Sequence, residues 1–280
     1  MNLLDEADLG QGAHSEVSPR RPPSWIGPVI SLLLFVALLA GFWAYRMRQA
    51  THSDVVPPLP VAAAQVPVTP LGQGAAPVAL PPLADLDPFL RTALAGLTRA
   101  AAATAWFATD YLAEQFVAIV QGVAEGRSPM RQMLRLRPSA PFKAISRGGR
   151  TTIDPASYAR YDAIGDAVVS LDPVTSARLY GTLKPRLEEA YATLGIPDSS
   201  LDAAVEGALV RLLATPVAEG PAEVRNNGGI YEFADARLEG LTPVQKLLLR
   251  TGPANAGRIR TRLREIALAL GIPASRLPTT

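Results

Sequence analysis

The chain contains no cysteine, and its only histidines are His14 and His52. Disulfides and metal sites built on thiolates are therefore excluded. Both histidines precede the expected folded domain, so that domain cannot hold a Ser-His-Asp or Cys-His nucleophilic system or a histidine-ligated metal. Neither a G-x-G-x-x-G motif nor a Gly-Lys-Ser/Thr loop occurs, which disfavours a nucleotide-binding site. We therefore expect no cofactor, and we favour binding over catalysis.

Charged residues are missing from one long apolar run, residues 25–45, which reads WIGPVISLLLFVALLAGFWAY. A helix of this length reaches about 31 Å, the thickness of a bilayer core. Trp25 at one end and Trp43 and Tyr45 at the other suit the membrane interface. The run predicts a single-pass transmembrane helix. The alternatives are a buried core helix and a cleaved signal peptide, but bulky Phe42 and Trp43 disfavour a cleavage site.

The residues around this run indicate its orientation and its tether. An acidic tail, residues 1–24, precedes it and is expected to be disordered. Two arginines flank the run on each side, so the free N-terminus alone favours a cytoplasmic tail and an exported C-terminal domain. Residues 46–86 are rich in proline and alanine and predict a semi-rigid, extended linker. We expect the helical domain over residues 87–272 and a short C-terminal tail over 273–280.

Capping motifs and apolar periodicity predict an all-α fold for the domain. Asp87-Pro88, Asp172-Pro173 and Thr242-Pro243 each combine an N-cap residue with proline at the first helical position. A further helix is expected to begin near Asp110, and residues 201–213 have the spacing of an amphipathic helix. The predicted fold class is therefore a single-pass transmembrane helix, a Pro/Ala-rich linker and a compact multi-helix domain with at most a small β-hairpin.

The one hairpin is expected where residues 142–145 and 151–153 flank Arg147-Gly148-Gly149-Arg150. A second turn, Asn226-Asn227-Gly228-Gly229, is expected to lead into a short helix over residues 231–239. The helix that follows Thr242-Pro243 should end at Gly252-Pro253, where the final helix begins.

Carboxylates and bases gather in the last third of the domain. Glu232, Asp235 and Glu239 have the i, i+3 and i+7 spacing of one helix face, and Lys246 and Arg250 follow them closely. We predict that at least one of these two bases pairs with one of the three carboxylates across a tight αα-hairpin. Two carboxylates can also perform glycoside hydrolysis, so a cell-wall-active hydrolase is the alternative function.

Positive charge is unevenly distributed along the domain. Residues 127–150 include seven bases and no acid, and a second basic stretch near the C-terminus contains the candidate anion-binding residues Arg258 and Arg262. The structural interpretation is that these bases pair with the acid-rich residues 154–239. The functional interpretation is an anion-binding surface for lipid headgroups or wall polymer. Nucleic acid is disfavoured because Phe142 is the only aromatic residue in the basic stretches.

Several short sequence motifs resemble those of a known family. They are Asp154-Pro155 with Tyr158-Ala159-Arg160-Tyr161, Ala190-Tyr191, Leu213-Ala214-Thr215-Pro216, Tyr231-Glu232-Phe233-Ala234-Asp235 with Leu238-Glu239, and Gln245-Lys246-Leu247-Leu248-Leu249-Arg250 with Gly252-Pro253. In these motifs the domain resembles the bacterial domain-of-unknown-function family 3014, whose members look like anchored envelope proteins. The resemblance implies a mostly helical domain and carries over no catalytic or binding residue.

The sequence departs from the family pattern in two places. Thr251 stands where the family usually has methionine, and Ala254 stands where it has an acid, whereas Asn255 matches. Any role that needs a carboxylate at position 254 is therefore in doubt.

Together these patterns predict a membrane-anchored periplasmic module of the bacterial inner membrane that binds or scaffolds without catalysis. Its expected partners are the lipid bilayer, through the anchor, and an envelope protein or an anionic wall or lipid partner. No nucleic-acid partner is expected.

Overall fold

The computed structural model describes residues 70–75, 78–217 and 220–279, which belong to one compact unit. The predicted tail, the apolar run 25–45 and most of the linker lie outside these residues. Among the described residues, no helix combines the length and the apolar character that crossing a membrane requires. The prediction of a single-pass inner-membrane protein is corrected accordingly, because nothing that the structure describes supports an anchor.

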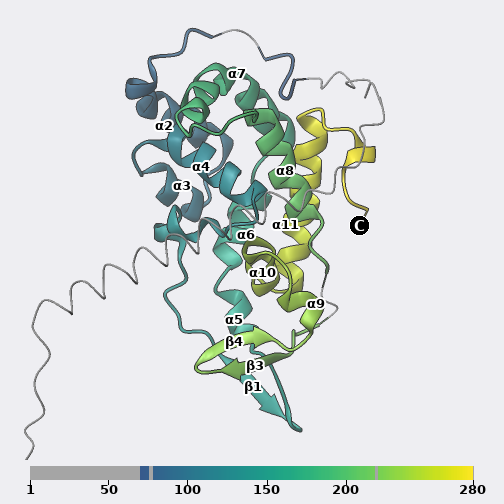
Figure 1. Ribbon diagram of the computed structural model, residues 1–280. Helices are drawn as coiled ribbons and strands as arrows, with labels where there is room; N and C mark the ends of the chain where they lie inside the picture. Colours follow the sequence, from purple (N-terminus) through teal and green to yellow (C-terminus); the bar gives the residue numbers. More distant parts are fainter. Residues whose placement is uncertain (1–69, 76–77, 218–219, 280) are drawn as a thin grey trace, which may run out of the picture. The chain divides into compact units, whose positions relative to one another are not determined.

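The first half of the unit is helical up to its first hairpin (Figure 1). A short 3-10 turn, η1, leads into three helices, and two further 3-10 turns then carry the chain to the strands. In order the elements are η1 Leu83–Asp85, α2 Leu86–Leu97, α3 Ala101–Phe107, α4 Leu112–Ala124, η2 Pro129–Arg131, η3 Leu134–Leu136, β1 Ala144–Arg147 and β2 Arg150–Ile153.

The second half contains the longest helices and the second hairpin. Its elements are α5 Pro155–Ala159, α6 Asp162–Val169, α7 Pro173–Ala192, α8 Leu201–Leu213, β3 Val224–Asn227, β4 Ile230–Phe233, α9 Ala236–Glu239, α10 Pro243–Arg250, α11 Pro253–Ala269 and η4 Ala274–Arg276. The sequence analysis did not predict helices over α3, α5 or α6. These helices are short, and they depend on packing against their neighbours more than on a long apolar stripe.

The main core lies where α4, α7, α8 and α11 pack together. The apolar stripe of α8, predicted from the sequence, supplies Leu201, Leu209 and Leu213, each at most 8% exposed. Segments outside the predicted domain boundaries also enter this core. Leu71 of the expected linker and Leu277 of the expected C-terminal tail are 4% and 6% exposed.

Two of the three predicted caps act on their own helices. The Asp172 carboxylate accepts a hydrogen bond from the Thr175 amide at 2.7 Å, and Thr242 forms a capping box with Gln245 at the start of α10. Asp87 behaves differently. Helix α2 begins one residue before it, and its carboxylate accepts from the amides of Tyr111 and Leu112 at 2.7 and 3.0 Å. It therefore caps α4, a helix about two dozen residues further on.

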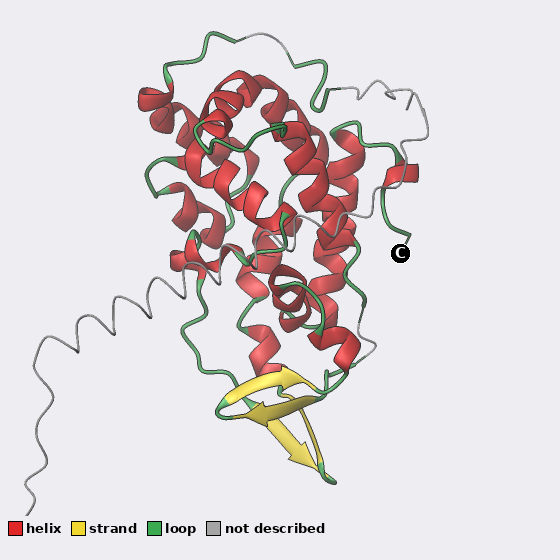
Figure 2. Ribbon diagram, viewed as in Figure 1, coloured by secondary structure: helices red, strands yellow, loops and turns green. Residues whose placement is uncertain are grey.

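Two small β-hairpins lie at one end of the helical unit (Figure 2). The first, β1–β2, is the one predicted. The second, β3–β4, corrects the all-α fold class and the helix expected over residues 231–239, of which only α9 is helical. Both hairpins turn through two glycines with positive φ, Gly148-Gly149 and Gly228-Gly229, as a two-residue turn of the favoured twist requires.

The hairpins are joined and cover a small second core. An isolated bridge pairs Thr152 with Glu223, and the Ile153 amide donates to the Ala222 carbonyl at 3.0 Å. Beneath them, Phe233 packs with Ile153, Val224 and Leu249, and all four are at most 5% exposed. The β-layer is thus attached to the helices through α10, which carries Leu249.

Candidate functional site

Of the predicted polar cluster, the structure brings Glu239 and Lys246 into contact. The Lys246 Nζ atom lies 2.5 Å from a Glu239 carboxylate oxygen and also donates to the Glu239 carbonyl at 3.1 Å. The two side chains are 21% and 27% exposed. The second Glu239 oxygen accepts from the Phe233 amide at 2.8 Å, which fixes the end of β4. This pair therefore joins the last strand to α10.

The other three members of the cluster have separate partners. Arg250 donates to the Tyr231 carbonyl at 3.3 Å and lies over the Phe233 ring, 5.6 Å from its centroid. Asp235 caps α9 and pairs with Arg237 at 3.0 Å, and Glu232 accepts from Asn227 at 3.0 Å. Each carboxylate is thus held by a donor of its own. This arrangement gives no support to the hydrolase alternative, which needs two carboxylates facing one cleft.

The environment of Glu239 shifts its acidity. Burial raises the pKa of the Glu239 carboxyl, but the hydrogen bonds from Lys246 and from the Phe233 amide, with the charges of Lys246 and Arg250, outweigh burial and hold that pKa below its ordinary value. The carboxylate is therefore stabilised in its charged form in the folded protein.

Glu239→Gln is expected to flatten the loss of stability between about pH 5 and about pH 3. Because the folded state lowers the pKa of Glu239, it binds fewer protons than the unfolded state, so the free energy of unfolding falls as the pH falls. This stabilisation is present above the unfolded pKa, about 4.3, and is lost as the pH drops through the folded pKa. Urea unfolding across this range measures it. Glu232→Gln, which leaves the Glu239–Lys246 pair in place, is the control, and equal pH slopes for parent and Glu239→Gln would contradict the expectation.

The two candidate anion-binding arginines are also engaged by the protein. Arg258 lies 2.5 Å from the Asp166 carboxylate and donates twice to the Asn255 side-chain oxygen, at 2.6 and 2.9 Å. Asn255 is 5% exposed and donates to Asp162 at 2.8 Å, so this network fastens α11 to α6. Arg262 pairs with Glu265 at 3.0 Å. Anion binding by these two arginines stays an untested prediction, and their partners assign them a structural role.

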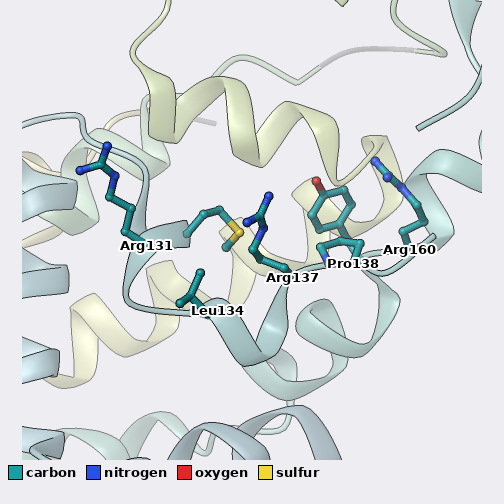
Figure 3. Close-up of a pocket in the computed structure, with 7 residues that line it drawn as sticks. Arg131, Leu134, Arg137, Pro138 and Arg160 are labelled. Atoms are coloured by element: carbon teal, nitrogen blue, oxygen red, sulfur yellow. The ribbon is translucent and has the colours of Figure 1, made fainter. Parts of the chain in front are cut away.

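Arginines without such partners line a cavity of about 410 Å³ between η2, η3 and α5. Its lining consists of Met130, Arg131, Leu134, Arg137, Pro138, Arg160 and Tyr161. The Ser128 hydroxyl accepts from the Met130 amide and starts η2, with Pro129 at its first position, and Pro138 prevents η3 from continuing as a longer helix. The two short turns place Arg131 at the end of η2 and Arg137 immediately after η3. In Figure 3 Arg131, Arg137 and Arg160 are spread along the lining of the cavity, with Arg137 between the other two.

Arg160 is held rigidly at the cavity wall. Its Nη1 donates to the Ala140 carbonyl at 2.7 Å and its Nε to the Ser157 carbonyl at 3.1 Å. Its guanidinium also lies over the rings of Phe142 and Tyr161, at 5.7 and 5.5 Å from their centroids. Its Nη2 makes no hydrogen bond with the residues that the structure describes. A fixed guanidinium with a remaining donor is preorganised to receive an anion.

No carboxylate among the described residues lies within salt-bridge distance of these three arginines. Other bases of the same run differ, because Arg127 pairs with Glu125 and Arg150 pairs with Glu223. The charge of the cavity is therefore not neutralised by the surrounding protein. The sequence marked the basic run 127–150, but it did not indicate which of its members line one cavity or that Arg160 joins them.

A second cavity of about 290 Å³ adjoins the first and shares Arg137, Pro138 and Arg160 with it. Its other lining residues come from α3, α6 and the segment around η3, and they are Ala102, Ala105, Arg135, Leu136, Ser139, Ala140, Ala163 and Ile164. Neither cavity is lined by a carboxylate, and within the described residues no three side chains of metal-binding type lie close enough to hold an ion.

Fold and cavity together define a class: a mostly helical domain with a small β-layer and an arginine-lined cavity. The family model described as "Protein of unknown function (DUF3014)" matches residues 112–267, more than half of the chain. The chain belongs to this family, which confirms the resemblance of its sequence motifs. Comparison with the curated proteins and with the solved structures gives no match.

Proposed function

We propose that this protein is a non-catalytic binding module that holds an anionic group in the cavity formed by Arg131, Arg137 and Arg160. The observation that carries the proposal is that three arginines line one cavity, while no described carboxylate lies within salt-bridge distance of any of them. Arginine keeps its charge throughout the neutral range and presents a planar set of donors that suits phosphate and carboxylate oxygens. An unpaired cluster of this kind costs stability through charge repulsion, and a bound anion offsets that cost.

Binding without chemistry follows from the residue types at the site. The lining residues of both cavities include no histidine, cysteine, aspartate or glutamate. These are the usual general bases and nucleophiles of enzymes that act on phosphate esters or glycosides. The cavity can therefore position an anion and stabilise its charge, but it offers no group of these types to attack it.

Arg137→Ala in the full-length protein is expected to weaken the binding of inorganic phosphate about tenfold or more. The variant removes one set of charge-assisted hydrogen bonds, and such bonds contribute about 1.5–3 kcal/mol. Titration of the protein with phosphate at low ionic strength, followed by isothermal calorimetry or by amide chemical shifts, measures the change. Arg137→Lys keeps the charge but loses the planar fork, so its affinity should lie between those of the parent and Arg137→Ala.

Arg147→Ala is the matched control for this measurement. Arg147 belongs to the same basic run and is exposed at the end of β1, but it lines neither cavity. Its removal changes the net charge equally and should leave phosphate affinity within about twofold of the parent, because Arg147 lines neither cavity and does not contact an anion bound there. Equal losses in the two variants would show that phosphate responds to overall charge, and the proposed site would then be rejected.

A further inference from the structure

The first cavity is larger than an inorganic anion needs, and its neighbour is mostly apolar. We propose that the natural ligand class is a phosphate monoester with an apolar tail, with the phosphate among Arg131, Arg137 and Arg160 and the tail in the second cavity. This inference rests on the proposed function and names the ligand of the same site.

The two cavities are arranged for a ligand with two unlike ends. Arg137, Pro138 and Arg160 form the wall that they share, so a group bound by these arginines lies at the entrance to the second cavity. Beyond that wall most lining residues are small and apolar, including Ala102 and Ala105 from α3. The polar additions there are Arg135 and Ser139. Polarity thus falls from the first cavity to the second.

Small side chains create the space in the second cavity. Ala105 of α3 and Ala163 of α6 face it from two elements that pack together, and alanine fills little of the volume that a larger apolar residue would occupy. The second cavity is open to solvent, so an apolar group bound there gains affinity by covering the apolar side chains that line it.

The charge at the first cavity favours phosphate over carboxylate as the head. A phosphate monoester carries up to two negative charges and three terminal oxygens, whereas a carboxylate carries one charge and two oxygens. The arginines that line the first cavity therefore match a phosphate head better than a carboxylate head. A polyanion is the competing ligand, because Arg135 also lines the second cavity. Six of the eight residues that line only this cavity are apolar, which favours an apolar tail over a second charged group.

A series of soluble alkyl phosphates tests the inference on the full-length protein. Methyl, butyl and octyl phosphate, each used below its aggregation concentration, should bind progressively more tightly. The expected gain is about threefold for each methylene that enters the second cavity, until that cavity is full. Octanoate should bind more weakly than octyl phosphate, and tripolyphosphate should also bind more weakly than octyl phosphate.

A cavity-filling variant locates the tail. Ala163 is exposed to solvent at the rim of the second cavity, so Ala163→Phe fills that space without disturbing the core. In this variant the chain-length dependence should disappear, while methyl phosphate affinity should stay within about twofold of the parent. Ala203→Phe is the matched control, because Ala203 is an exposed alanine of α8 that lines neither cavity. It should keep the parental chain-length dependence.

The possible failures separate this inference from the proposed function. Affinity that depends on Arg137 but not on chain length, or tighter binding of tripolyphosphate than of octyl phosphate, would overturn the apolar tail and leave anion binding intact. Tighter binding of octanoate than of octyl phosphate would overturn the phosphate head and also leave anion binding intact. Chain-length dependence that is unchanged in Arg137→Ala, or no binding of any alkyl phosphate, would overturn both. A chain-length dependence that survives in Ala163→Phe would reject the second cavity as the place of the tail.

Discussion

Asp202→Ala is expected to lower the free energy of unfolding by about 2–4 kcal/mol. The Asp202 carboxylate lies 2.5 Å from the Lys184 ammonium and accepts a hydrogen bond from the Tyr180 hydroxyl at 2.6 Å. It also accepts from the Leu71 amide at 3.2 Å, and this bond attaches the segment around Leu71 to α8. The ion pair is only 17% and 15% exposed. Alanine would therefore leave a buried ammonium and two further donors without their acceptor.

The hydroxyl of Tyr180 depends on the same carboxylate. Burial, and then the hydrogen bond to Asp202, raise the pKa of Tyr180 above its ordinary value. This hydroxyl therefore stays protonated and acts as a donor throughout the neutral range. Its hydrogen bond is part of what Asp202→Ala removes.

Glu188→Ala is the matched control for Asp202→Ala. Glu188 is the other carboxylate beside Lys184, at 3.8 Å, but it is 54% exposed. Exposed i, i+4 pairs contribute well under about 1 kcal/mol, so this variant should be nearly as stable as the parent. The urea midpoints of Asp202→Ala and Glu188→Ala measure this difference in stability. Equal midpoints would show that solvent or another group replaces the Asp202 carboxylate and that the Lys184–Asp202 pair does not stabilise the fold.

Local sequence chemistry predicted the long helices correctly. The Asp172-Pro173 and Thr242-Pro243 caps and the apolar stripe of residues 201–213 each act within a few residues, so the sequence contains the whole interaction. Asp87-Pro88 has the same local form, but its carboxylate caps α4 instead of its own helix. A capping motif does not reveal which of two neighbouring helices its carboxylate will cap, because tertiary packing determines which amide groups lie beside that carboxylate.

The second hairpin was missed for a related physical reason. Glu232, Asp235 and Glu239 have a helical spacing, but Tyr231 and Phe233 alternate with Glu232 as a strand requires, and the two-glycine turn precedes them. When a short segment fits both a helical and a strand pattern, the elements that pack against it determine its secondary structure. Here β3 supplies the partner, and burial of Phe233 against Leu249 selects the strand.

The candidate site shows the same division between local and long-range information. The run of bases over residues 127–150 was visible in the sequence, and so were Arg258 and Arg262. The partner of Arg258 was not visible, because Asp166 reaches it from 92 residues away, whereas Arg262 pairs with Glu265 only three positions along the chain. Arg160 stands outside the run and reaches the cavity only because α5 folds back on the segment around Ala140. Charge counting therefore located the basic stretches but did not indicate which of their arginines pair within the protein, and anion binding by Arg258 and Arg262 stays a prediction.

Phe233→Ala is expected to have the largest effect on stability, about 3–5 kcal/mol. Phe233 is 1% exposed and stands at the centre of the second core, between the two hairpins and α10. Its removal exposes the apolar faces of Ile153 and Val224 to a cavity that the short strands cannot collapse to fill. Arg250 would also lose the ring beneath its guanidinium. Because the β-layer is attached mainly through this core, we expect it to loosen before the main helical core unfolds.

Two variants and two measurements make this expectation decisive. Ile230→Ala removes an apolar side chain from the same strand, but Ile230 is 69% exposed, so its cost should stay within about 0.5 kcal/mol. Phe233→Leu keeps most of the buried volume and should cost clearly less than Phe233→Ala. Urea unfolding gives the free energies, and amide hydrogen exchange reports the two layers separately, with protection lost first at the ladder amides of β3 and β4. Uniform loss of protection over β3, β4 and α8 would show that the two cores unfold as one unit, and a cost similar to that of Ile230→Ala would show that Phe233 does not organise the β-layer.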